Sequence, residues 1–156
     1  MVGVGIGVLV ACSADTLAAP SVTGVDAAAG VQAAYLSTRC VDAWSPKVLR
    51  GGMGAHFVLA IEERVNLLEK ATAFNGLVVA TNLEASQSLY ALDLTQPVAL
   101  MVGNEGAGLS ADLLAVAGAR IRIPMPGKIE SLNAAAAAAI CLFERVRQLD
   151  RKVGMA

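Results

Sequence analysis

Three glycines and a carboxylate stand together after an apolar stretch in the second half of the chain. The segment Gly103-Asn104-Glu105-Gly106-Ala107-Gly108-Leu109 directly follows a predicted strand and precedes a predicted helix. Glycines let the backbone adopt positive φ and approach a ligand closely, and α/β proteins bind ligands at the carboxyl ends of strands. The spacing matches neither a dinucleotide fingerprint nor a P-loop, and a plain tight turn is the alternative. Glu105 favours a ligand site, because a carboxylate among glycines gains nothing from packing.

A second cluster combines prolines with polar residues. Ile123-Pro124-Met125-Pro126-Gly127 is followed by Ser131, Asn133 and six alanines at 134–139. Two prolines and a glycine impose an irregular loop, whose backbone N–H and C=O groups are free to hold a ligand. Ser131 is a natural N-cap for the final helix, and capping alone would explain it. The alanines form a smooth helical surface that another helix can approach closely, although an ordinary packed helix is equally compatible with them.

A third cluster, between Cys40 and Phe57, carries basic and aromatic side chains. Lys47 and Arg50 lie three residues apart on one predicted helical face, which suits phosphate contacts, and Trp44 could stack on a base. His56 is the only histidine. A buried, hydrogen-bonded ring explains it as well as acid–base chemistry does, and we do not expect it to be catalytic.

Composition predicts one domain that associates with another copy. The chain has 156 residues, of which 56% are hydrophobic and 16% are charged. One core is expected at this length, and the apolar excess favours an obligate oligomer, a dimer. The net charge of −1 does not indicate nucleic-acid binding. Seven basic residues against three acidic ones lie between 120 and 152, but a solvated helix face explains this excess equally well.

Targeting and metal signals are missing from the sequence. The apolar runs at 1–14 and 131–143 are shorter than the roughly 20 residues of a membrane span. No Lys or Arg precedes Arg39, so the charged start of a signal peptide is lacking, and we expect a cytoplasmic protein. Cys12, Cys40 and Cys141 are odd in number and widely spaced, which predicts buried thiols rather than disulfides or a zinc site. No metal is expected.

Predicted strands and helices alternate, which is typical of an α/β fold with a mostly parallel sheet and helices on both faces. Strands are expected at 4–11, 32–36, 58–61, 77–81, 97–102 and 119–123. Helices are expected at 46–53, at 62–74, after Ser110 and at 131–149, with a short helix at 26–30 that Gly30 ends. No internal repeat indicates a second domain.

Three segments in this order and spacing resemble the SpoU/TrmH branch of the SPOUT RNA methyltransferases: SPKVLRGGMGAHF, ALMVGNEGAGLS and IRIPMPGKIESLNAAAAAAICLFE. The resemblance covers about residues 26–149. It implies a single domain over 1–156, with a divergent part at 1–30 and a C-terminal helix and tail at 131–156 that form a deep trefoil knot, a topology that sequence reasoning would normally exclude. It also implies 2′-O-ribose methylation of rRNA or tRNA, with S-adenosyl-L-methionine as cofactor, by a homodimer that needs no metal.

Position by position, the resemblance also implies a set of site residues. The cofactor contacts fall on the backbone around Thr81, Asn82, Gly103, Ile123, Met125 and Leu132. The residues that match the family's polar active-site residues are Glu105, Ser131 and Asn133, which would orient the ribose hydroxyl for in-line attack. Lys47 and Arg50 are expected to contact RNA.

The family's first motif does not match. It consists of Asn-x-Gly and then an arginine that helps to deprotonate or stabilise the attacking 2′-hydroxyl. Without gaps, Ala18 and Gly24 stand at the asparagine and the arginine, and residues 1–38 contain no Asn, Arg or Lys. Arg39 or Arg50 would have to substitute. The alternative is a relative that binds cofactor or RNA without turnover, while a generic nucleotide-binding protein would rest on the glycines alone.

Overall fold

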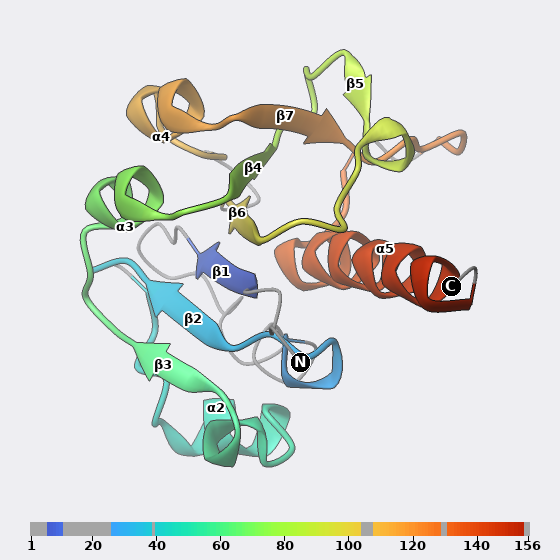
Figure 1. Cartoon of the computed structure of the whole chain (residues 1–156). Coiled ribbons are helices and arrows are strands. Elements are labelled where there is room, and N and C mark those ends of the chain that lie inside the picture. Colours follow the sequence, from blue (N-terminus) through green and yellow to red (C-terminus); the bar gives the residue numbers. More distant parts are fainter. Residues whose placement is uncertain (1–5, 11–25, 39, 104–107, 129–130, 155–156) are drawn as a thin grey trace.

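One parallel sheet organises the chain in a computed structural model that describes residues 6–10, 26–38, 40–103, 108–128 and 131–154 (Figure 1). The sheet has seven strands in the order β3-β2-β1-β6-β4-β7-β5, and every pairing between neighbours is parallel. The strands are β1 (Ile6–Val10), β2 (Ala33–Leu36), β3 (Ala60–Glu62), β4 (Leu77–Thr81), β5 (Gln87–Ser88), β6 (Val98–Val102) and β7 (Ala119–Arg122). The predicted α/β class with a parallel sheet is confirmed.

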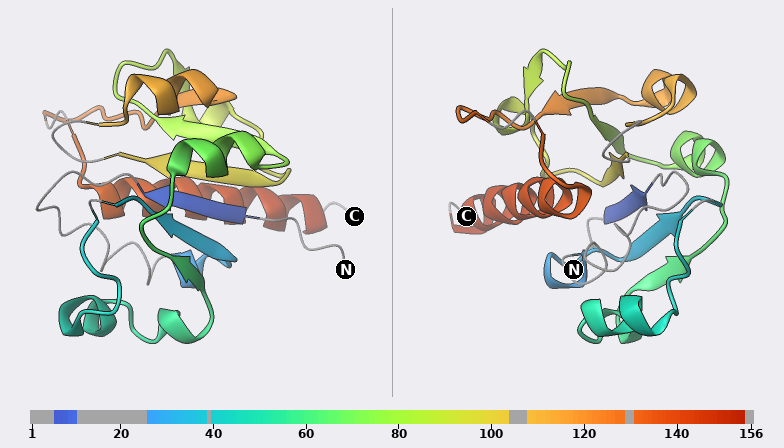
Figure 2. Two further views of the ribbon diagram at one scale, coloured as in Figure 1. Left: turned by 90° about the vertical axis from the view of Figure 1, so that its left-hand side faces the viewer. Right: turned by 180° about the vertical axis from the view of Figure 1, so that it is seen from behind.

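Helices cover both faces of the sheet. The 21-residue α5 (Ala134–Gly154) packs on one face, and the shorter α3 (Leu67–Ala73) and α4 (Ala111–Val116) pack on the other (Figures 1 and 2). The remaining described elements are α2 (Pro46–Gly51) and the 3-10 turns η1 (Ala55–Phe57) and η2 (Leu89–Ala91). Among the described helices, none is long and apolar enough to cross a membrane.

Strand β6 shows why these strands are continuous apolar runs. All five of its residues are buried, and their side chains alternate between two cores. Ala99 and Met101 belong to the core under α3 and α4, whereas Leu100 belongs to the core under α5. A strand covered on both faces needs apolar residues at every position, which is what made β4 and β6 visible in the sequence.

Helix boundaries depart from the prediction where a polar side chain closes the first turn. The final helix begins at Ala134 rather than at 131, because the Asn133 side chain accepts a hydrogen bond of 2.7 Å from the Ala136 N–H. Of the two explanations of Ser131 that the sequence leaves open, capping is therefore not the one seen in the structure. Likewise α3 begins at Leu67, where Asn66 accepts from two backbone N–H groups, so the helix predicted over 62–74 was too long at its start.

The N-terminal half contains a buried carboxyl group. Residues 26–28 are helical, and Gly30, at φ 74°, ends this turn as predicted. The Asp26 side chain is fully buried, and its oxygens have no hydrogen-bond partner among the described residues. Burial raises the pKa of Asp26 to about 8.

The cysteines follow the prediction only in part. Cys141 is a buried free thiol, as expected, and burial raises its pKa to about 12. The expectation of a free thiol is wrong for Cys40, which is disulfide-bonded. Cys12 lies outside the described residues.

Candidate functional site

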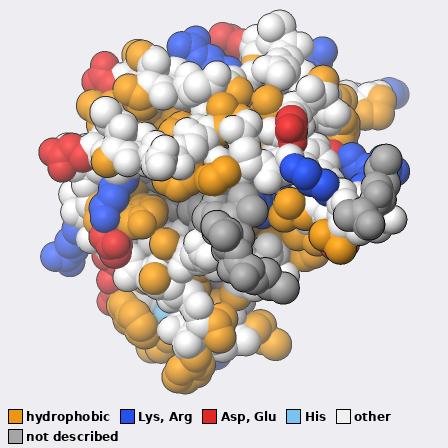
Figure 3. All heavy atoms as spheres, in the orientation of Figure 1, with side chains coloured by type: hydrophobic (Ala, Val, Ile, Leu, Met, Phe, Trp, Pro, Cys, Tyr) orange, Lys and Arg blue, Asp and Glu red, His pale blue; other side chains and the backbone are white. Residues whose placement is uncertain are grey.

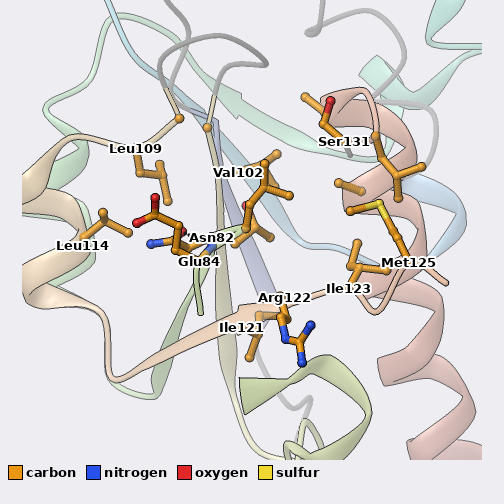
Figure 4. Close-up of a pocket in the computed structure, with 17 residues that line it drawn as sticks. Asn82, Glu84, Val102, Leu109, Leu114, Ile121, Arg122, Ile123, Met125 and Ser131 are labelled. Carbon is orange, nitrogen blue, oxygen red and sulfur yellow. Dashed lines mark hydrogen bonds between the residues drawn. The ribbon is translucent and has the colours of Figure 1, made fainter. Parts of the chain in front are cut away.

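A cavity of about 400 Å³ opens at the carboxyl ends of β4, β6 and β7, against the start of α5 (Figure 4). This volume lies within the range of roughly 300–1,000 Å³ that small-molecule sites occupy, at the sheet edge where α/β folds bind ligands. Its described lining consists of Thr81, Asn82, Leu83, Glu84, Val102, Gly103, Gly108, Leu109, Leu114, Ile121, Arg122, Ile123, Met125, Ser131, Leu132, Ala134 and Ala137.

The turn after β4 forms a fixed wall of this pocket. The Asn82 N–H donates to the Ile121 carbonyl at 2.9 Å, which ties the turn to β7. The Asn82 side chain then accepts from the Glu84 N–H at 2.8 Å, and the Thr81 hydroxyl donates to the Met101 carbonyl at 3.2 Å. Two of these bonds join the turn to β7 and β6 and the third lies within the turn, so the protein's own hydrogen bonds hold this wall.

The turn after β6 depends on Gly103. A Cβ at this position would lie 2.4 Å from the carbonyl carbon of Gly108, because the chain returns there to begin the approach to α4. Gly108 itself has φ 63°. Gly103 and Gly108 are therefore explained by the close contact between their backbones and by the positive φ of Gly108. The sequence predicts the approach of a ligand as a further reason. Residues 104–107, including the predicted catalytic Glu105, lie outside the described residues.

The segment after β7 supplies the opposite wall. Ile123, Met125, Ser131 and Leu132 line it, and Figure 4 shows Ser131 and Met125 on the same side of the pocket. The Ser131 side chain is exposed, and Asn133 rather than Ser131 caps α5. Asn133 does not line the pocket, because its side chain is engaged at the start of α5.

Little charge faces this cavity. Among the described lining residues, Glu84 is the only acidic one and Arg122 the only basic one, and no ion pair joins them. Figure 4 shows the Glu84 carboxylate near Leu109 and Leu114, while the Arg122 guanidinium points away toward η2. An uncharged, largely flat group with a few polar edges suits such walls.

The predicted RNA contacts lie elsewhere, on α2. Lys47 and Arg50 are exposed, and neither lines the pocket. Helix α2 follows the carboxyl end of β2, so it lies on the same side of the sheet as the pocket but toward the β3 edge (Figure 2, left). Trp44, half-exposed, packs against His56 with the ring centroids 5.1 Å apart, and His56 Nε2 lies 2.7 Å from the Ala43 carbonyl. This hydrogen bond agrees with a structural role for His56.

Several lining residues were not predicted from the sequence. Leu109, Leu114 and Ile121 look like ordinary core residues, and Glu84 looks like an ordinary surface residue. Among these residues only Ala137 could have been suggested by the sequence. It belongs to a run of alanines, and such small side chains leave room for a ligand beside the helix. No group of three or more His, Cys, Asp or Glu within the described ranges could hold a metal ion.

Comparison with known proteins finds clear relatives. The model of the SpoU rRNA Methylase family matches residues 24–143. An uncharacterised tRNA/rRNA methyltransferase of Synechocystis sp. is 38% identical over 125 residues, which are 78% of this chain and 46% of that protein. The 23S rRNA (guanosine(2553)-2′-O)-methyltransferase RlmP of Bacillus subtilis is 35% identical over 118 residues, 74% of this chain and 48% of that protein.

A solved structure shows the same fold with a ligand. The AdoMet-bound rRNA methyltransferase from Sinorhizobium meliloti has a TM-score of 0.81 and 34% identity, and the match covers 93% of this chain and 57% of that one. The chain thus spans about half the length of the curated relatives it matches.

Proposed function

This chain belongs to the SpoU rRNA methylase family, and on that premise we propose that the pocket at the ends of β4, β6 and β7 binds S-adenosyl-L-methionine for 2′-O-methylation of ribose in rRNA or tRNA. The proposal takes residues 1–156 as one SPOUT domain. It rests on the resemblance of the chain to proteins named as rRNA and tRNA methyltransferases, and on the pocket described above.

One observation carries the proposal: three separate loops meet around a single cavity. Besides Thr81, Asn82 and Gly103, the residues that they bring to its walls include Ile123, Met125, Ser131 and Leu132. The apolar side chains suit an adenine ring, and the main-chain groups of the irregular loops supply hydrogen bonds without fixed charges. The residues present therefore fit the cofactor.

When bound, S-adenosyl-L-methionine supplies an electrophilic methyl group on a cationic sulfur. We propose that the Ser131 hydroxyl orients the ribose 2′-hydroxyl toward that group, because Ser131 lines the pocket and is exposed to an incoming substrate. Asn133 fixes the first turn of α5 through its bond to the Ala136 N–H, which positions Ser131. Glu105 remains a predicted catalytic residue in the glycine loop.

RNA is proposed to approach along the side of the sheet that carries both the pocket and α2. Lys47 and Arg50 project from α2 into solvent, where they can contact phosphates. Trp44 has 52% of its surface exposed, enough for a base to stack on its free face.

A second candidate function is cofactor or RNA binding without methyl transfer. It is favoured by the missing first motif, since residues 1–38 contain no Asn, Arg or Lys. Arg50 does not line the pocket of its own chain, and Arg39 lies outside the described residues. Arg122 is the only arginine among the described lining residues, and its guanidinium points away from the other labelled pocket side chains in Figure 4.

Calorimetry with S-adenosyl-L-homocysteine tests the pocket. The substitution Ala137→Leu places a larger side chain in the cavity while keeping a good helix former, so it is expected to weaken binding at least tenfold. Ala136→Leu is the matched control, since Ala136 is the neighbouring residue on α5 and does not line the cavity. A wild-type protein that binds nothing, or an Ala137→Leu variant with unchanged affinity, contradicts the proposed pocket.

Mass spectrometry of nucleosides from RNA incubated with the protein and S-adenosyl-L-methionine separates the two candidate functions. Methylation at a 2′-oxygen identifies the enzyme. Cofactor binding with no methylated nucleoside, on rRNA and tRNA lacking modifications, supports the relative without turnover.

We further propose that the chain forms a cytoplasmic homodimer. Large apolar side chains gather on the surface around α2 and η1, at the lower end of Figure 3, and Phe143 of α5 is 48% exposed. The exposed residues of the first group are Trp44, Leu49, Met53, Phe57 and Val58. Sedimentation equilibrium tests the dimer, and fractionation of cells tests the compartment.

The C-terminal trefoil knot is also part of the proposal. Support comes from the family membership and from the lining of the pocket, to which both the residues after β7 and the start of α5 contribute. Tracing the path of α5 through the preceding loop in a crystal structure tests it.

A further inference from the structure

Glu84 is the only acidic residue among the described residues that line the pocket, and its side chain is exposed. Figure 4 shows this carboxylate near Leu109 and Leu114, at the end of the cavity opposite Ser131 and Met125. Its side chain makes no hydrogen bond or ion pair with the described residues. An ionised carboxylate only accepts hydrogen bonds, so a ligand group that replaces solvent at the exposed Glu84 side chain has to donate them.

The backbone holds Glu84 in place. The Asn82 side chain accepts from the Glu84 N–H at 2.8 Å, and the Ala85 N–H donates to the Asn82 carbonyl at 3.1 Å. Asn82 is itself bonded to β7 through the Ile121 carbonyl. The position of the Glu84 Cα is thus set by the sheet, and only side-chain torsions remain to be ordered on binding.

Among the parts of an adenosyl cofactor, the ribose diol best matches such an acceptor. Two neighbouring hydroxyls can donate to the two oxygens of one carboxylate, as acidic residues do for ribose in dinucleotide-binding folds. The amino-acid end of the cofactor carries its own carboxylate, which Glu84 would repel. The reacting methyl group is assigned to the Ser131 end of the pocket, away from Glu84.

We propose that Glu84 recognises the ribose 2′- and 3′-hydroxyls of the adenosyl cofactor and so selects ribonucleosides over deoxy analogues. Glu84 is then a specificity-determining residue that takes no part in methyl transfer. This inference rests on the proposed function, because it needs the adenosyl group in this pocket.

The test is calorimetry with S-adenosyl-L-homocysteine and its 2′,3′-dideoxy analogue on the wild type and on Glu84→Gln. The wild type is expected to prefer the ribose form by about tenfold or more, the effect of losing hydrogen bonds to a charged acceptor. Glu84→Gln is expected to bind the ribose form about tenfold more weakly and to lose most of the preference. Asp112→Asn is the matched control, since it removes one negative charge from the exposed first turn of α4 without touching the cavity, and it should keep the preference.

Two results would overturn the inference alone. One is a Glu84→Gln variant that binds the ribose form as well as the wild type does. The other is equal weakening of both ligands, which places the carboxylate on the adenine amino group or the ammonium group instead. If the folded wild type binds neither ligand, the proposed function fails first and the inference falls with it.

Discussion

Replacing the buried Asp26 by asparagine should make the protein more stable at neutral pH and remove most of its pH dependence. The Asp26 side chain is fully buried, and neither oxygen is hydrogen-bonded within the described residues. Desolvation raises its pKa from 3.8 to about 8, so at pH 7 the folded protein must either keep a proton on this group or bury a charge.

The sign and size of the effect follow from proton linkage. Because the pKa of Asp26 is higher in the folded state, the folded protein binds a proton more tightly than the unfolded chain does. The contribution of protonated Asp26 to the free energy of unfolding is therefore fully present below the unfolded pKa. Stability is then lost as the pH rises toward the folded pKa, by about 1.4 kcal/mol for each pH unit. Between pH 4 and pH 7 the free energy of unfolding should fall by about 4 kcal/mol from this group alone. Asparagine has nearly the same shape and does not titrate, so Asp26→Asn should escape this loss.

Urea unfolding followed by circular dichroism between pH 4.5 and pH 8 measures both proteins, provided that each unfolds in one cooperative step. Asp93→Asn is a suitable control, since hydrogen bonds from the Thr95 hydroxyl and backbone N–H lower the pKa of Asp93. That exposed group contributes stability that is lost as the pH falls, which is the opposite sign. Parallel profiles for the wild type and Asp26→Asn across this range would refute the assigned burial.

Two further substitutions test the loops and the proposed RNA surface. Gly103→Ala should destabilise the protein by about 1 to 3 kcal/mol in urea, because the new Cβ would lie 2.4 Å from the Gly108 carbonyl carbon; a variant as stable as the wild type would contradict the observed loop closure. The double substitution Lys47→Ala and Arg50→Ala should weaken RNA binding and flatten its dependence on salt in filter-binding assays, while leaving S-adenosyl-L-homocysteine affinity unchanged. If the dependence of RNA affinity on salt concentration is unaltered, Lys47 and Arg50 of α2 do not contact RNA phosphates.

The elements that sequence reasoning located well are those that the sheet buries. Strand β4 lies over 77–81 as predicted, and β6 begins one residue later than expected, because residues covered on both faces must be apolar throughout. Strand β5 was missed. It has only two residues, Gln87 and Ser88, and no apolar pattern.

Site residues were harder to predict, because their roles depend on which of several polar groups the backbone uses. Ser131 and Asn133 are both good N-caps by type, and in the structure Asn133 takes this role while Ser131 lines the pocket. Gly103 was expected to lie against a ligand. The structure adds a second reason for a glycine here, because the backbone of Gly108 leaves no room for a Cβ at position 103. The residues next to Glu84 in the sequence do not predict that it lines the pocket. Its position follows from the turn that Asn82 connects to β7.

Strand β1 is an inner strand of the sheet, paired on both of its edges. This strand lies between β2 and β6. It therefore joins the half of the sheet next to α2 to the half that carries the pocket. The family model begins to match only at residue 24, after this strand. The five residues of β1 therefore join the two halves of the sheet, although they lie before the part that matches the family model. A chain shortened past Val10 would leave the facing edges of β2 and β6 unpaired, and each edge could then pair with a strand from another molecule.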